Sequence, residues 1–116
     1  MERDDLRERT KQFALRIMRL YRALPSSKDA QVVGGQLLRC GTSVSANYRA
    51  ACRARSRAEF VAKLGIVVEE ADESLFWLEL LSETGLVRKP RLEPLLAEAN
   101  ELTAIFTAAR KTSRSQ

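Results

Sequence analysis

Hydrophobic positions along the chain repeat with the spacing of an amphipathic helix in four separate segments. Apolar residues recur every three or four positions over residues 6–24, 33–51, 60–81 and 92–109. No segment shows the strict alternation of apolar and polar residues that is typical of a half-buried strand. The pattern therefore predicts an all-α protein with four helices.

Residues typical of turns and caps separate the four apolar stripes. Pro25 follows the first stripe, Ser56 is an N-cap residue with a capping-box partner at Glu59, and Gly85 fits the position just after the third helix. We predict helices over residues 4–24, 28–53, 56–84 and 91–111, followed by a frayed tail over 112–116. Because the connections are short and 116 residues suit one hydrophobic core, we expect a single domain, an antiparallel up-down four-helix bundle.

Three glycines, Gly34, Gly35 and Gly41, lie inside the second predicted helix. Each costs about 1 kcal/mol relative to alanine in a helix interior. Close approach to a neighbouring helix would offset that cost, so we expect tight packing along this face. The third predicted helix carries an apolar stripe wide enough to contact more than one neighbour.

Composition narrows the class of protein further. Charged residues make up 30% of the chain and apolar residues 45%, which favours an ordered domain. The charged start is unlike a secretory signal, and no apolar run reaches the ~18 residues that span a bilayer. Cys40 and Cys52 would lie roughly 18 Å apart along one helix, too far for a disulfide. We expect a soluble, cytoplasmic protein with reduced cysteines and no membrane contact.

The sequence gives little support for a catalytic or a metal-binding site. Histidine is absent, which removes the commonest general base and imidazole metal ligand. Ser43, Ser45 and Asn47 lack a base that could activate a nucleophile, so we expect them to bond to helix backbone or across a helix contact. Glu70 and Glu73 lie one turn apart, but carboxylate-bridged metal sites in bundles need Glu-x-x-His pairs. We expect no catalytic residue, no metal site and no cofactor.

Charge is unevenly divided between the second and third predicted helices. Residues 28–57 hold six basic residues and one acid, whereas residues 58–87 hold one basic residue and seven acids. The candidate site for an anion consists of five arginines: Arg39, Arg49, Arg53, Arg55 and Arg57. With a net charge of +5, a nucleic-acid phosphate backbone is the natural partner.

The same arginines allow a second interpretation, in which they pair with the acids of the next helix or are only solvated. For Arg39 and Arg49 both interpretations remain open at this stage. For Arg53, Arg55 and Arg57 we expect exposure, because like charges at one helix end repel each other unless an anion approaches. Aromatic residues are nearly absent from this face, so base stacking is not expected.

One central segment resembles a known family. The segment SVSANYRAACRARSRAEF, preceded by QLLRCGT and followed by KLGIVVEEADESLFWLELL, is similar to the four-helix bundle proteins first recognised as open reading frames in intervening sequences of 23S ribosomal RNA genes. The resemblance covers about residues 13–86, and the fourth predicted helix matches only in pattern. Much of that family has Glu-Gly where this chain has Ala50 and Ala51, so no acidic role is carried over there.

The resemblance implies an up-down bundle that assembles into a ring-like homopentamer, with no established enzymatic activity. It also implies a relation to the accessory protein of diversity-generating retroelements, which binds nucleic acid and a reverse transcriptase. Our leading hypothesis is a non-enzymatic homo-oligomer that binds RNA or DNA backbone through the five arginines, with Arg39 as an auxiliary. The alternatives are a scaffold that docks an acidic protein or a nucleic-acid enzyme, and a purely structural oligomer whose arginines all pair with acids.

Overall fold

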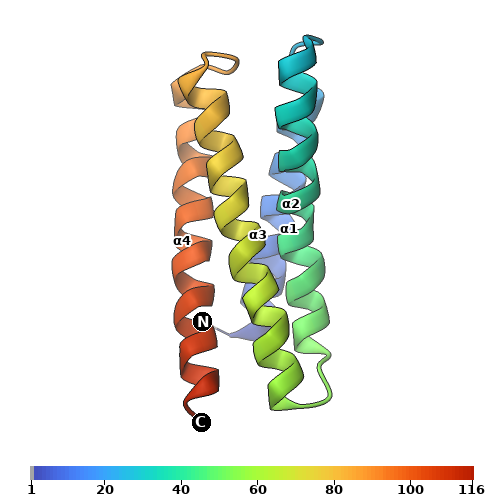
Figure 1. Cartoon of the computed structure of the whole chain (residues 1–116), viewed down its shortest axis with the longest axis vertical. Coiled ribbons are helices and arrows are strands. Elements are labelled where there is room, and N and C mark those ends of the chain that lie inside the picture. Colours follow the sequence, from blue (N-terminus) through green and yellow to red (C-terminus); the bar gives the residue numbers. More distant parts are fainter. Residues whose placement is uncertain (1) are drawn as a thin grey trace.

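The computed structural model describes residues 2–116, and within them it contains four helices. Their bounds are α1 Arg3–Arg22, α2 Lys28–Cys52, α3 Arg57–Glu83 and α4 Lys89–Arg114. Successive helices run antiparallel in a rod of 46 × 19 × 19 Å (Figure 1). The prediction of an all-α, up-down four-helix bundle is confirmed. Over residues 2–116, no helix has the length and hydropathy needed to cross a membrane.

Local capping explains where α3 begins and ends. The Ser56 hydroxyl accepts a hydrogen bond from the Glu59 backbone N–H at 3.1 Å, as the capping-box pattern predicts. After the other end of α3, Gly85 adopts a φ of +74°, in the left-handed region that glycine enters without steric cost. The chain then turns at once into α4.

The last helix extends further than the sequence pattern indicated. Residues 112–116 were expected to fray, but α4 continues to Arg114. Two basic residues in its last turn, Lys111 and Arg114, interact favourably with the negative end of the helix dipole. In addition, the Arg57 guanidinium donates a hydrogen bond to the Gln116 carbonyl, which links the end of the chain to the start of α3. The helix therefore ends three residues later than the predicted end at residue 111.

The core is organised around α2 and α3. Helix α3 packs against both α2 and α4, which accounts for its wide apolar stripe, while α1 packs mainly on α2 and barely contacts α4. Phe13, Ile17 and Phe106 are among the largest fully buried side chains. The Tyr48 ring of α2 packs against the Phe106 ring of α4, with 4.9 Å between the centroids.

Two of the three glycines of α2 pack closely against side chains of α1 or of the turn that follows it. A Cβ atom at Gly34 would come within 2.3 Å of the Leu24 side chain, and one at Gly41 within 2.9 Å of the Ile17 side chain. Gly35 has no such neighbour within 4 Å. The prediction of tight helix packing is therefore confirmed for Gly34 and Gly41 but not for Gly35.

Candidate nucleic-acid interface

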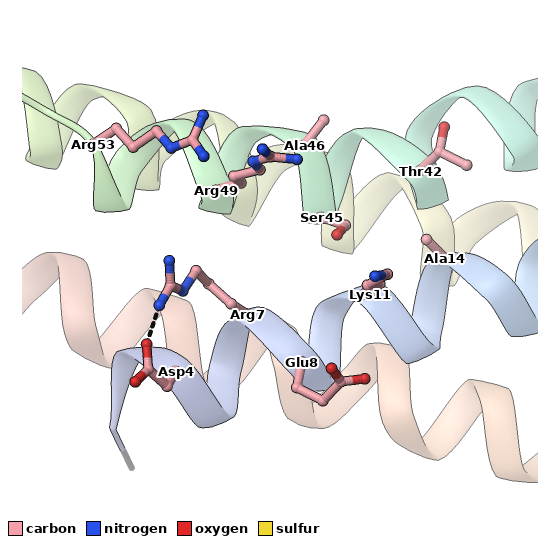
Figure 2. A pocket seen from close by; sticks show the side chains of 10 residues that line it. All are labelled: Asp4, Arg7, Glu8, Lys11, Ala14, Thr42, Ser45, Ala46, Arg49 and Arg53. Atoms are coloured by element: carbon pink, nitrogen blue, oxygen red, sulfur yellow. Dashed lines mark hydrogen bonds and ion pairs between the residues drawn. The ribbon is translucent and has the colours of Figure 1, made fainter.

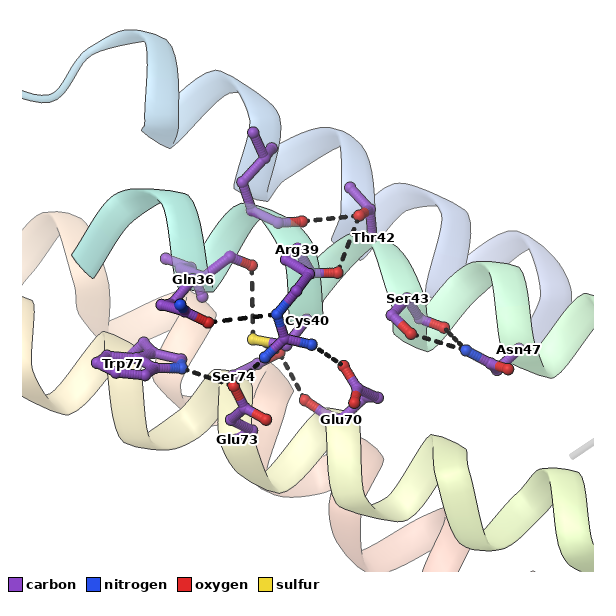
Figure 3. A network of polar contacts seen from close by, with 12 residues as sticks. Gln36, Arg39, Cys40, Thr42, Ser43, Asn47, Glu70, Glu73, Ser74 and Trp77 are labelled. Atoms are coloured by element: carbon purple, nitrogen blue, oxygen red, sulfur yellow. Dashed lines mark hydrogen bonds and ion pairs between the residues drawn. The ribbon is translucent and has the colours of Figure 1, made fainter. Parts of the chain in front are cut away.

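Arg39 is engaged by the acidic side of α3. Its Nη1 atom lies 3.1 Å from Glu70 Oε2, and its Nη2 atom pairs with Glu73. Trp77 Nε1 donates a hydrogen bond to the same Glu73 carboxylate at 3.0 Å, and Gln36 Oε1 accepts one from Arg39 Nε at 3.3 Å (Figure 3). Two carboxylates thus offset the Arg39 charge, so this residue joins α2 to α3 and is not a free cation.

The polar residues beside Arg39 are also occupied within the fold. Asn47 Nδ2 donates hydrogen bonds to the Ser43 carbonyl at 3.0 Å and to the Ser43 hydroxyl at 2.7 Å, as expected for local helix bonding (Figure 3). Buried Ser74 bonds to the Glu70 carbonyl at 2.8 Å, and its hydroxyl lies 3.3 Å from Cys40 Sγ. Burial raises the pKa of the Cys40 thiol, so Cys40 behaves as a packing residue.

Arg49 and Arg53 differ from Arg39 in having no ion pair within residues 2–116. Both are exposed near the end of α2. They line a groove of about 730 Å³ that runs between α1 and α2. Figure 2 shows Arg7 on the α1 side of this groove, with its guanidinium joined to Asp4 of the same helix, and Arg49 and Arg53 on the opposite side. Arg7, Lys11, Arg49 and Arg53 define what we call the basic groove.

The basic residues that α1 contributes to the basic groove were not predicted from the sequence. Arg7 and Lys11 are one turn apart on the exposed side of α1. Asp4 pairs with Arg7, and this hydrogen bond raises the pKa of the Arg7 guanidinium. Glu8 also lines the groove, and its carboxylate accepts a hydrogen bond from Gln12 at 2.8 Å. Four basic and two acidic side chains leave the groove with a net positive charge.

Small side chains form the rest of the lining of the basic groove. They are Ala14, Thr42, Ser45 and Ala46. The Thr42 hydroxyl already donates to the Leu38 carbonyl at 2.7 Å. Because these side chains are short, the long cationic side chains on either wall project above a hollow that a ligand backbone could enter.

The two remaining arginines of the candidate site lie around the turn between α2 and α3. Arg55 is 91% exposed, and its Nε atom is 3.7 Å from Glu59 Oε2, a long and solvated pair. Arg55 and Lys63 share a shallow hollow with Arg49 and Arg53, which extends the positive surface from the basic groove toward α3. Arg57 lines a different hollow at the end of the bundle. There the Arg3 guanidinium stacks on the Phe60 ring, 4.4 Å from its centroid.

The structure thus divides the five predicted arginines into three groups. It brings Arg49, Arg53 and Arg55 together and pairs Arg39 with acids of α3. Arg57 lies at the bundle end, in a hollow that Arg55 also borders. The pairing of Gly34 with Tyr21 and of Gly41 with Ile17 places the first turns of α1 beside the end of α2, which brings Arg7 and Lys11 to the same groove as Arg49 and Arg53.

Among residues 2–116, no group of three or more potential ligands could hold a metal ion. Glu70 and Glu73, which were considered as possible metal ligands, both form ion pairs with Arg39. Their carboxylates therefore serve as ion-pair partners.

Comparisons with known proteins agree on one family. Residues 2–108 match the family model described as 23S rRNA-intervening sequence protein. The fold is similar to a crystal structure of a protein of unknown function from the S23 ribosomal protein family of Bacteroides thetaiotaomicron. The two chains are 35% identical with a TM-score of 0.88, over 96% of this chain and 99% of the other. No match was found among curated proteins.

Proposed function

The chain belongs to the 23S rRNA-intervening sequence protein family, and from that premise we propose that it is a non-enzymatic protein that binds the RNA or DNA backbone. The binding residues are Arg49, Arg53 and Arg55, at the end of α2 and in the following turn. The observation that carries the proposal is that Arg49 and Arg53 are exposed, close together and without an ion pair within residues 2–116.

The electrostatics of this surface favour a phosphate ligand. Arg49, Arg53, Arg55 and Lys63 border one shallow hollow, where Glu59 is the single acid. A cluster of like charges raises the free energy of the unbound protein, and a line of phosphates relieves that repulsion while releasing counterions. No aromatic side chain borders the hollow, so the contacts would be made to the backbone and not to stacked bases.

Charge reversal at the two central arginines tests the proposal. Labelled RNA and DNA oligonucleotides are titrated with nuclease-treated protein, and binding is followed by fluorescence anisotropy. We expect the double variant Arg49→Glu, Arg53→Glu to lose about tenfold or more in affinity for both. The matched control is Arg88→Glu, Lys89→Glu, which makes the same change in net charge at exposed positions at the other end of the bundle. Equal losses in the two variants, or no binding by the wild type at low salt, would refute the proposed site.

We further propose that copies of the chain associate, because α3 exposes apolar side chains that the bundle does not cover. Phe76 is 51% exposed and lies between the exposed acids Asp72 and Glu79 on the same helix. A second copy offers a complementary surface. The weakly packed side between α1 and α4 forms a groove with apolar Leu20 and Leu95 and the basic residues Arg16, Arg19 and Arg91.

Contact between two different surfaces of identical chains generates a ring when the rotation closes. The homopentamer implied by the family resemblance is such a ring. Native mass spectrometry should give five subunits for the wild type and a monomer for Phe76→Glu, with Val32→Glu as a control at another exposed apolar position. A monomeric wild type at high concentration, or a Phe76→Glu variant that still assembles, would contradict this mode of association.

A further inference from the structure

We infer that the ligand is a single strand and not a duplex, and that its sugar-phosphate backbone lies along the basic groove between α1 and α2. This inference rests on the proposed function, and it adds Arg7 and Lys11 to the site. The juxtaposition that supports it is a pair of cations on each wall of one groove: Arg7 and Lys11 on α1, and Arg49 and Arg53 at the end of α2 (Figure 2). The α1 wall also carries Asp4, which pairs with Arg7, and Glu8, so the groove keeps a net positive charge.

The spacing of the four cations fits one line of phosphates. On each wall the two basic residues are four positions apart, which is about 6 Å along a helix axis. That distance is comparable to the separation of neighbouring phosphates in a single strand. Packed helices lie about 8–10 Å apart, so long side chains from both walls can reach the same strand.

A duplex fits this arrangement poorly. Its two rows of phosphates lie on a convex surface, separated in B-form DNA by grooves about 6 and 12 Å wide and in A-form RNA by one deep, narrow groove and one wide, shallow groove. If one row entered the basic groove, the other would lie over the outer side of a neighbouring helix. On the α1 side that surface carries the exposed acids Glu2 and Asp5, which lie outside the groove lining and would repel it. A single strand avoids this cost.

The lining of the groove indicates how the strand would be held. The small residues Ala14, Ser45 and Ala46 leave room for the sugar-phosphate chain between the cationic side chains. No aromatic side chain lines the groove, so the bases would point to solvent and the sequence would matter little. The site would recognise a strand by its charge and its narrow, flexible backbone.

The test compares an unstructured single strand with a duplex. An oligouridine and a blunt-ended RNA duplex of equal length are titrated by anisotropy at low salt. We expect the oligouridine to bind about tenfold tighter or more. Arg7→Glu, Lys11→Glu should weaken its binding severalfold, but less than Arg49→Glu, Arg53→Glu does, because Asp4 already pairs with Arg7. The control is Arg88→Glu, Lys89→Glu. If the α1 variant fails to fold, as judged by its thermal unfolding, Arg7→Gln, Lys11→Gln replaces it.

Two outcomes would overturn the inference while leaving the proposed function intact. One is a duplex that binds as tightly as the single strand. The other is an α1 variant that binds the oligouridine as well as the wild type while the α2 variant does not. If neither nucleic acid binds to the wild type, the proposed function fails together with the inference.

Discussion

Gly41 of α2 lies directly on the side chain of Ile17 of α1, so that a Cβ atom at position 41 would come within 2.9 Å of Ile17 Cγ1. Because glycine has no Cβ, the two helices can approach closely at this contact. The same pair forms the walls of the basic groove. A residue that is costly for an isolated helix therefore supports the geometry of the candidate site.

This contact predicts opposite effects for alanine at two glycines of α2. Gly41→Ala should lower the free energy of unfolding by about 1–3 kcal/mol, because the stiff, branched Ile17 side chain must move. Gly35→Ala should raise it by up to about 1 kcal/mol, because alanine favours the helix and nothing lies within 4 Å of the new methyl group. Urea denaturation measures both. Equal stability of the two variants would show that the close contact is not limiting.

Arg39 and Arg49 lie on the same helix but should contribute differently to binding. Arg39→Ala should leave nucleic-acid affinity nearly unchanged, because Glu70 and Glu73 already offset its charge. Since the Arg39 side chain is 51% exposed, this variant should lose no more than about 1 kcal/mol of unfolding free energy. Arg49→Ala should weaken binding severalfold without a comparable loss of stability. Anisotropy and thermal unfolding of both variants distinguish these effects, and equal losses of affinity would contradict the distinction.

The ion pair between α1 and α4 should make stability depend on pH. Arg9 donates two hydrogen bonds to Glu98, at 2.8 and 2.7 Å, and this lowers the pKa of the Glu98 carboxyl. Because the pKa is lower in the folded state, the stabilisation is fully present above the unfolded value of about 4.3 and is lost as pH falls through the folded value.

Replacing Glu98 tests this linkage. Glu98→Gln should cost about 2 kcal/mol at neutral pH, because a hydrogen-bonded charge pair is broken while Arg9 stays partly buried. The difference in the free energy of unfolding between this variant and the wild type should shrink as the solution is acidified. Glu101→Gln is the control, since Glu101 is 62% exposed and accepts one hydrogen bond from Arg9. A difference that stays constant with pH would contradict the linkage.

The two cysteines should differ in reactivity. Cys40 is fully buried, and burial raises the pKa of its thiol, whereas Cys52 is half-buried. A thiol reagent at mildly alkaline pH should modify Cys52 first and reach Cys40 only when the bundle unfolds. Mass spectrometry of the labelled protein over time measures the two rates. Modification of both cysteines at the same rate would show that Cys40 is more accessible than its burial indicates.

Hydrophobic periodicity was sufficient to predict the four helices and their order. Each stripe is long and strongly periodic, and Ser56 and Gly85 mark the ends of α3 with their own backbone requirements. The family resemblance was also correct, because the residues that carry it extend through α2 and α3. The end of α4 was misjudged because the hydrogen bond between Arg57 and Gln116 joins residues far apart in sequence.

The candidate site was only partly predictable from the sequence. A helical wheel shows that Arg39, Arg49 and Arg53 share one side of α2, but it does not show which neighbour lies beside each residue. Arg39 lies opposite two glutamates of α3, whereas Arg49 and Arg53 border α1. The roles of Arg7 and Lys11 follow from the antiparallel register between α1 and α2, and that register depends on tertiary packing.

The salt dependence of nucleic-acid affinity tests the proposed binding most directly. The logarithm of the affinity of the wild type for an oligouridine should fall linearly with the logarithm of salt concentration, by about 0.7 for each phosphate contacted. Arg49→Glu, Arg53→Glu should flatten that slope by about 1.4, the value for two contacts. No binding at low salt, or an unchanged slope in the variant, would contradict phosphate binding by these arginines.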